Sequence, residues 1–335
     1  MAIPMMLEPR NLQGLYEKFG AETPSALLKW FPDRPAVEVG NKVQYDIVKY
    51  GSDVAQVNIY GGAPNAVKPP IRGTVMAAGL TMSEEIIVPA TVIKGLRDAG
   101  STTIGPASAW VARAMKQLRI RVNKRKALLA AQALGIASGS LSFTLPGAAS
   151  ATTVSLGYSS TPNNHATIGS AWQTASTGVL AEIIAAKLKI AQDSGKQPTD
   201  MVMNSVTGAY LSGNDEIIDL LSDNARDQVR ENGVIPRIAG LDVTYVDETY
   251  VNDLTGTATG IIPDDFVAIL AGDSTDRAMI ECAPASLHAS DSSRGMFFWV
   301  VEGPNINDPI KVQCEITFLP YLPNPDEVVY DTDVT

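Results

Sequence analysis

The sequence predicts an α+β fold in which helices and strands are partly segregated along the chain. The stretch 107–137 has apolar side chains at helical spacing. The segment IKVQCEITFL at 310–319 alternates between apolar and polar side chains without a fault, which is typical of a half-buried strand. With 335 residues, of which 45% are hydrophobic and 19% charged, the chain can bury a sizeable core.

The first 41 residues read as short helical pieces that prolines interrupt. The second piece, ALLKWFPDRP, brings Trp30 and Phe31 together in a segment that is too short to bury its own apolar groups. We therefore expect this N-terminal arm to lie against another surface.

Residues 42–82 predict an extended two-stranded ribbon with an irregular return. KVQYDIVKYG and VAQVNIYGG read as strands, and in the second Val57 and Ile59 alternate with polar neighbours. The return, GGAPNAVKPPIRG, contains three prolines and cannot be a helix or a central strand. An isolated ribbon is marginally stable in water, so this one should need a neighbouring surface.

The stretch 107–137 predicts one long helix, about 46 Å long if it is unbroken. A dense basic cluster, KQLRIRVNKRK at 116–126, lies within it, and no Asp or Glu occurs between Asp98 and Glu182. The predicted apolar stripe consists of Val111, Met115, Leu118, Val122, Leu129, Ala133 and Ile136. Basic residues that fall away from this stripe are Arg113, Lys116, Arg121 and Lys124.

Charge is divided unevenly along the chain. Residues 1–190 carry 19 basic and 11 acidic groups (net +8), residues 191–335 carry 7 and 25 (net −18), and the sum is −10. This division indicates a basic surface for polyanions, with an uneven scatter of solubilising charge as the alternative. The basic cluster itself reads either as a solvated helix face or as a surface that neutralises phosphates without reading bases. It has no interleaved aromatic residues for stacking on single strands.

The second half of the chain predicts a helix at TGVLAEIIAAKLKIAQDSG, with Gly195 as its stop. Its inward residues would be Val179, Ile183, Ala186 and Ile190. DMVMN reads as a short buried strand that leads into helical SVTGAYLS and DEIIDLLSD, and LDVTYVDE, FVAILAG and MFFWVVEG read as further strands.

Catalytic patterns are scarce. His165 and His288 lie in loop-like surroundings. Three acidic pairs occur, at Glu84–Glu85, Asp215–Glu216 and Asp264–Asp265, and the second and third are explained by a helix start and a turn. The chain has no nucleophile elbow, HExxH or GxGxxG motif. We therefore expect no enzymatic activity, no cofactor and no metal.

The two cysteines and the hydropathy indicate the compartment. Cys282 and Cys314 are far apart and in no metal-binding spacing, which favours reduced thiols in a cytoplasm. No apolar run reaches the length of a membrane span, and the N-terminal segment lacks the pattern of a secretory signal, so we expect no membrane partner.

Three stretches together match the pattern of a known family: DMVMNSVTGAYLSGNDEIIDLL, YVDETYVNDLTGTATGIIPDDFVAILAGD and ITFLPYLPNPDEVV. They resemble the major capsid proteins of lambda-type tailed bacteriophages, which have the HK97 fold. The second is the most specific, with a strand, a polar turn, an (I/L)PDD step and a buried strand. The resemblance in the order of parts extends over nearly the whole chain.

The resemblance implies five parts. These are an N-terminal arm (1–41), an E-loop ribbon (42–82), a peripheral domain with a spine helix (83–160), an axial domain (161–308), and a returning strand with a C-terminal tail (309–335).

It also implies roles for particular residues. Arm and ribbon would contact adjacent copies through Trp30, Phe31, Val57, Ile59, Tyr60, Lys68 and Arg72. The spine helix would face DNA in the lumen with Arg113, Lys116, Arg121 and Lys124. The loop nearest the capsomer centre would hold Tyr250, Asn252 and Asp253. Some members of the fold cross-link subunits through a lysine and an asparagine, but no motif fixes that pair here.

The expected function is structural: self-assembly, through hexamers and pentamers, into an icosahedral shell around double-stranded DNA. The protein would reside in the head of a phage or prophage virion assembled in the host cytoplasm, and portal, scaffolding and decoration proteins are further implied partners. One alternative is a compartment shell of the same fold around protein cargo, which would need less lumenal positive charge. The other alternative is an enzyme, which would need a catalytic constellation.

Overall fold

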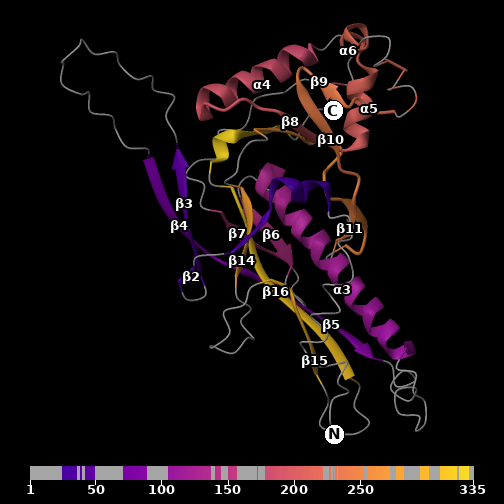
Figure 1. Ribbon diagram of the computed structural model, residues 1–335. Coiled ribbons are helices and arrows are strands. Elements are labelled where there is room, and N and C mark those ends of the chain that lie inside the picture. The colour runs from indigo at the N-terminus through magenta and orange to yellow at the C-terminus, as the bar shows by residue number, and fades with distance from the viewer. Residues whose placement is uncertain are drawn as a thin grey trace, which may run out of the picture.

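In a computed structural model of the chain, the alternating segment forms the long strand β16 (Ile310–Tyr321), the centre of a five-stranded sheet (Figure 1). Strand β5 (Leu80–Val88) pairs antiparallel with β16 along one edge. The other edge of β16 pairs antiparallel with two strands in succession, β14 (Ala278–Cys282) and β15 (Phe297–Val301). Strand β1 (Asp33–Pro35) in turn pairs parallel with β14.

The structure describes most of the chain, with gaps. The described residues are 25–35, 38–39, 42–49, 71–88, 105–136, 140–144, 150–156, 172, 178–221, 226–227, 229, 231, 233–252, 255–271, 277–282, 295–301, 310–322 and 324–331. Within them the mixture of helices and strands confirms the predicted α+β class.

The long helix forms as predicted and crosses the first sheet. It is α3 (Gly105–Ala131), which continues into a π-helical turn at Gln132–Ile136. Four of the predicted stripe residues, Met115, Leu118, Val122 and Leu129, are at most 2% exposed and belong to the same core as Val312 of β16. Ala133 is also buried and Ile136 is half-buried, whereas the side chain of Val111 lies outside the described residues.

A second five-stranded sheet builds the upper domain in Figure 1. Its order is β17-β13-β8-β10-β9, with bounds β17 (Val328–Asp331), β13 (Val267–Leu270), β8 (Asp200–Met203), β10 (Leu241–Tyr245) and β9 (Arg237–Ile238). Strands β8 and β10 are parallel, and β13 is antiparallel to both β8 and β17.

Helices α4 (Val179–Ser194), α5 (Ser205–Gly213) and α6 (Asp215–Leu220) accompany this second sheet. The four predicted inward residues of α4 are fully buried, which confirms that stripe. Helix α4 ends as predicted, because Gly195 adopts a left-handed conformation with φ of 72°. None of the described helices combines the length and the apolar character that crossing a membrane requires.

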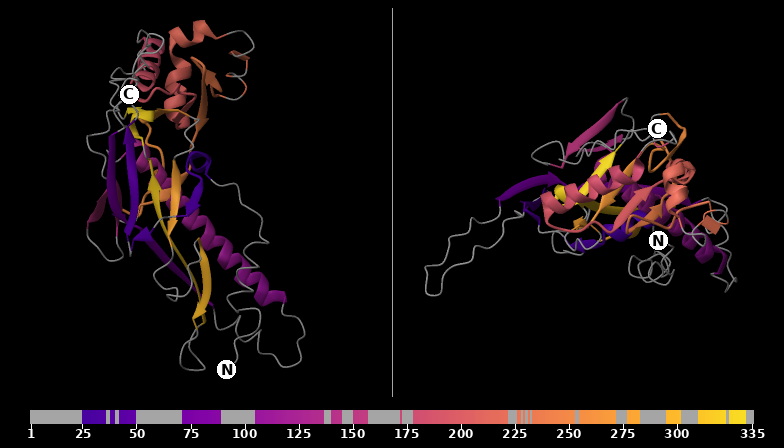
Figure 2. Two further views of the ribbon diagram at one scale, coloured as in Figure 1. Left: turned by 60° about the vertical axis from the view of Figure 1, so that its left-hand side comes forward. Right: turned by 90° about the horizontal axis from the view of Figure 1, so that it is seen from above.

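The ribbon is present, but its second strand differs from the prediction. Strand β3 (Lys42–Lys49) pairs antiparallel with β4 (Ile71–Ala78), and a short β2 (Glu38–Val39) extends the sheet. Figure 2 shows β3 and β4 at one side of the molecule. The predicted strand at VAQVNIYGG lies outside the described residues.

Two small antiparallel hairpins complete the described fold. One is β6 (Ser140–Thr144) with β7 (Ala151–Ser155), and the other is β11 (Thr249–Val251) with β12 (Ala258–Gly260).

The two large sheets divide the chain differently from the five predicted parts. Strands β14 and β15 fall within the predicted axial segment 161–308 but pair with β16 in the first sheet, since Cys282 and Phe298 are buried in its core. Conversely, β17 falls within 309–335 but is fully paired along β13 in the second sheet. The last described strand therefore ties the second sheet to the first.

Candidate functional site

The basic side of α3 is the most distinctive charged feature of the described fold. The helix carries seven basic residues and no acidic one. Arg113, Lys116, Arg121 and Lys124 are exposed, which agrees with their predicted position away from the buried stripe. Arg119 and Arg125 are half-buried on its flanks.

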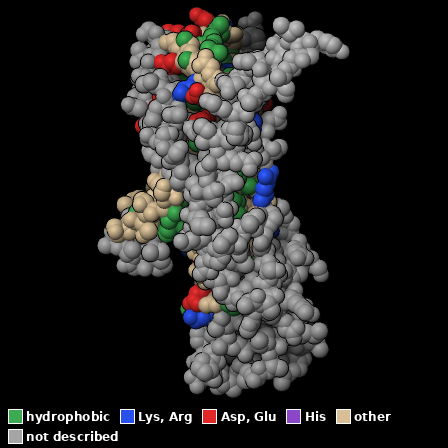
Figure 3. All heavy atoms as spheres, turned by 90° about the vertical axis from the view of Figure 1, so that its left-hand side faces the viewer, with side chains coloured by type: hydrophobic (Ala, Val, Ile, Leu, Met, Phe, Trp, Pro, Cys, Tyr) green, Lys and Arg blue, Asp and Glu red, His purple; other side chains and the backbone are tan. Residues whose placement is uncertain are grey.

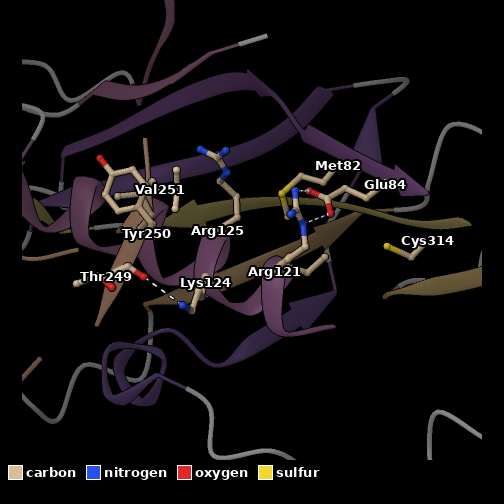
Figure 4. A pocket seen from close by; sticks show the side chains of 11 residues that line it. Met82, Glu84, Arg121, Lys124, Arg125, Thr249, Tyr250, Val251 and Cys314 are labelled. Atoms are coloured by element: carbon tan, nitrogen blue, oxygen red, sulfur yellow. Dashed lines mark hydrogen bonds and ion pairs between the residues drawn. The ribbon is translucent and has the colours of Figure 1, made fainter. Parts of the chain in front are cut away.

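Arg121 and Lys124 make contacts within the subunit (Figure 4). The Arg121 guanidinium forms a two-pronged ion pair with the Glu84 carboxylate of β5, with Nη2 donating to Oε1 at 3.0 Å. Lys124 Nζ donates to the Thr249 carbonyl oxygen of β11 at 3.2 Å. The pair with Glu84 partly neutralises Arg121, although its side chain remains 67% exposed.

Sequence reasoning did not anticipate these partners. The Glu84–Glu85 pair follows a strand pattern on β5, so the two carboxylates point to opposite faces of the sheet. Glu84 faces Arg121, whereas Glu85 accepts hydrogen bonds from Lys311 and Gln313, which hold the pKa of its carboxyl below its usual value.

A cavity of 520 Å³ lies between α3, β5, β11 and β16, beside these contacts (Figure 4). Its walls combine cations with apolar side chains, and burial raises the pKa of the Cys314 thiol there to about 11. The lining residues are Met82, Glu84, Arg121, Val122, Lys124, Arg125, Leu128, Thr249, Tyr250, Val251 and Cys314.

Lys126 departs from the rest of the basic cluster because it is buried, with a side chain only 7% exposed. Its Nζ lies 2.9 Å from Asp33 Oδ1 and 3.0 Å from Glu281 Oε1, and 5.6 Å from the centre of the Phe318 ring. The lysine therefore joins α3 to β1 and β14 and does not belong to the exposed basic side of α3.

Replacing this lysine should destabilise the subunit. We expect Lys126→Met to lower the free energy of unfolding by about 3 kcal/mol, because it leaves the largely buried Glu281 carboxylate without its cation. Urea unfolding followed by circular dichroism measures the change. Lys311→Met is the matched control, because its partner Glu85 is 40% exposed and the loss should stay below about 1 kcal/mol. Equal losses in both variants would contradict this role.

Trp30 and Phe31 require a correction. We expected both to contact an adjacent subunit, but they are 5% and 1% exposed and belong to the subunit's own core. The 3-10 helix η2 (Ala26–Trp30) packs against α3 and turns these rings inward. This part of the arm is therefore ordered by its own chain.

The remaining predicted contact residues are not placed by the structure. Val57, Ile59, Tyr60 and Lys68 lie outside the described residues, and Arg72 is in β4 with its side chain outside them. They stay predictions.

The predicted capsomer-centre loop is partly described. Tyr250 packs against the core that contains α3, and the Asn252 amide nitrogen donates to the Thr257 carbonyl within the β11–β12 hairpin. Asp253 lies outside the described residues. The hairpin also accepts a hydrogen bond from Lys124 of α3, and its role nearest the capsomer centre stays a prediction.

Comparison with known structures supports a capsid fold. The putative capsid protein of a prophage from E. coli CFT073 is similar with a TM-score of 0.60 and 11% identity, over 97% of this chain and 99% of that one. A phage-related protein from Bordetella bronchiseptica RB50 is similar with a TM-score of 0.57 and 11% identity, over 98% and 97%. These likenesses confirm the HK97-like fold that the resemblance implied.

The family assignment rests on most of the chain. No curated protein matches the sequence. Residues 41–330, however, match the family described as phage major capsid protein E. This range includes β3, β4 and α3 and, apart from β1 and the last residue of β17, both large sheets. The chain therefore belongs to the phage major capsid protein E family.

Proposed function

We propose that this subunit assembles through pentamers and hexamers into an icosahedral shell that encloses double-stranded DNA. Membership of the family already makes it a structural component of the phage capsid, built from many copies. We further propose that double-stranded DNA is the partner inside the shell, that the role of the subunit is structural rather than enzymatic, and that assembly takes place in the host cytoplasm. Portal, scaffolding and decoration proteins are further proposed partners.

The basic side of α3 carries the DNA part of the proposal. The chain is acidic overall, but the exposed charged side chains of α3 are all basic, and this concentrates positive potential on one side of the helix. Exposed lysine and arginine side chains bind phosphates regardless of base sequence, which suits densely packaged DNA. We assign this contact to the four exposed basic residues Arg113, Lys116, Arg121 and Lys124, of which Arg121 also pairs with Glu84.

The ribbon carries the assembly part. Strands β2, β3 and β4 form a sheet that, in the described part of the chain, shares no strand with the two large sheets. A ribbon of this kind gains little from its own packing and should be stabilised by lying on an adjacent copy. We assign this contact to Val57, Ile59, Tyr60, Lys68 and Arg72.

Charge reversal on α3 tests the DNA contact. The variant Arg113→Glu, Lys116→Glu, Lys124→Glu should bind short duplexes of any sequence more weakly than the parent subunit. The plot of log affinity against log salt concentration has a negative slope, and its magnitude should decrease by about 3, one for each lost phosphate contact. Binding is measured by fluorescence anisotropy at several salt concentrations.

Arg237→Glu is a control, since this exposed arginine lies on the second sheet and should leave the slope unchanged. An unchanged affinity in the triple variant would mean that the helix face is merely solvated. Particles that hold protein cargo and no DNA when formed in the host would favour the compartment shell.

A further inference from the structure

The cavity between α3, β5, β11 and β16 has an apolar floor. Val122, Leu128 and Cys314 line it and are buried, and the Cys314 thiol stays neutral because burial raises its pKa to about 11. Val251 of β11 also lines the cavity and is 63% exposed. In Figure 4 it lies next to Tyr250. The exposed valine extends the apolar surface from the cavity to the outside of the subunit.

Positive charge predominates in the same lining. Its cations are Arg121, Lys124 and Arg125, and among the described residues its one carboxylate belongs to Glu84. The balance is a surplus of two positive charges. Glu84 pairs with Arg121, whereas Lys124 donates its hydrogen bond to the Thr249 carbonyl oxygen, an acceptor without a full charge. An anionic group that enters the cavity would be attracted by this surplus.

Acidic groups gather in a different part of the molecule. Helix α6, beside the second sheet, carries the exposed residues Asp215 and Asp219. Figure 3 shows acidic side chains at the upper end of the molecule, where the second sheet lies in Figure 1. An acidic partner would be repelled at that end and attracted by the basic side of α3. The distribution of charge therefore directs such a partner towards the cavity.

The combination of an apolar floor and a cationic rim restricts the class of ligand. The volume of 520 Å³ lies within the range of about 300–1,000 Å³ that is usual for ligand pockets. Duplex DNA presents phosphates and sugars on its outside, so it could pair with the cations but would leave the apolar floor empty. A protein segment can supply carboxylates and apolar side chains together, and both acidic motifs and amphipathic helices are bound in this way.

We propose that the cavity binds an acidic, amphipathic segment of a partner protein. Carboxylates of the segment would pair with Lys124 and Arg125 at the rim, and its apolar side chains would fill the space between Leu128 and Val251. One contact would then remove apolar surface from water and offset the surplus of positive charge. The proposal depends on neither the ribbon nor the DNA contact.

Peptide binding tests the class of ligand. A fluorescein-labelled peptide, Glu-Glu-Leu-Leu-Glu-Glu-Leu-Leu-Glu-Glu, carries both kinds of group, and its fluorescence anisotropy reports binding to the parent subunit. One control peptide has serine in place of leucine, and the other has glutamine in place of glutamate. We expect the first peptide to bind about tenfold more tightly than either control, since each control lacks one kind of contact. Equal affinity for the first peptide and either control would overturn the proposal.

A substitution at the edge of the cavity tests the place of binding. Val251→Asp puts a carboxylate beside the apolar floor and should weaken the affinity for the first peptide by about tenfold. Val206→Asp is the matched control and should leave the affinity unchanged, because Val206 is 43% exposed but lies on α5 beside the second sheet. Circular dichroism checks that both subunits fold. If Val251→Asp bound the peptide as tightly as the parent does, the assignment to this cavity would be wrong.

Two other results would identify a different occupant and overturn the proposal. If Val251→Asp weakened duplex binding and left peptide binding unchanged, the cavity would belong to the DNA contact. If Val251→Asp chains expressed alone formed no particles while Val206→Asp chains did, a second copy of this chain would fill the cavity.

Lys116→Gln separates this contact from the DNA contact. Lys116 is exposed on α3 but does not line the cavity, so its loss should weaken duplex binding and leave peptide binding nearly unchanged. A loss of peptide binding as large as that in Val251→Asp would overturn the assignment to the cavity. If duplex binding did not change while the peptide still bound, the DNA contact would fail and the peptide contact would stand.

Discussion

Replacing residues 50–70 by Asn-Gly should abolish particle formation and leave a folded subunit. Lys49 and Ile71 are register partners at the ends of β3 and β4, so a two-residue type I′ turn can close the hairpin there without strain. The variant keeps both large sheets but loses the segment that we expect to lie on an adjacent copy. Large particles should disappear from sizing chromatography, while the far-ultraviolet circular dichroism stays close to that of the parent.

A second shortened hairpin controls for the loss of a loop as such. Thr144 and Ala151 are register partners of β6 and β7, so residues 145–150 can be replaced by the same Asn-Gly turn. This variant should still assemble. If the first variant assembled at the parental yield, residues 50–70 would not be needed for assembly, and the contacts between copies would involve other surfaces.

The substitution Gly135→Ala should destabilise the subunit by about 3 kcal/mol or more. Gly135 has φ of +129°, a conformation that side-chain-bearing residues rarely adopt, and an added Cβ would overlap the Tyr330 ring. Tyr330 belongs to β17 of the second sheet, so the clash falls where the end of α3 meets that sheet. Urea unfolding of the non-assembling Asn-Gly variant at residues 50–70 gives the free energy of a single subunit.

Gly213→Ala is the matched control for this substitution. Gly213 ends α5, has no unusual φ, and an added Cβ there would meet nothing within 4 Å. Its stability should change by less than about 1 kcal/mol, since alanine is at least as favourable as glycine in a helix. If Gly135→Ala changed stability as little as the control does, the contact between the π-helical turn after α3 and β17 would not be close.

Local periodicity was sufficient to predict the elements whose pattern is contained in one segment. Helix α3, the inward stripe of α4 and the alternation of β16 all repeat every two or 3.6 residues within their own bounds. The sheet to which β14, β15 or β17 belongs depends on pairing with strands far away in the chain, and short apolar runs do not encode their partners. This explains why the predicted division at 308 and 309 differs from the two sheets.

The prediction for Trp30 and Phe31 is wrong, and the burial of Lys126 was not predicted. Trp30 and Phe31 seemed to need an adjacent subunit because their segment is short, yet the contact with α3 buries them within the chain. Lys126 was grouped with the basic cluster, although its spacing from Val122 and Leu129 places it on the apolar stripe. The helical spacing alone therefore predicts that Lys126 is buried, whereas its charge suggests an exposed position.

The position of β16 and β17 has a consequence for biosynthesis. Strand β16 is the shared neighbour of β5, β14 and β15, and β17 closes the second sheet along β13. A ribosome that adds about 5–20 residues per second releases these strands tens of seconds after β5. Until then neither sheet is complete, so a nascent chain on a crowded polysome has no finished subunit to join to its neighbours. Products of premature termination before residue 310 should likewise be excluded from the shell, and every subunit that enters it has been translated through β17.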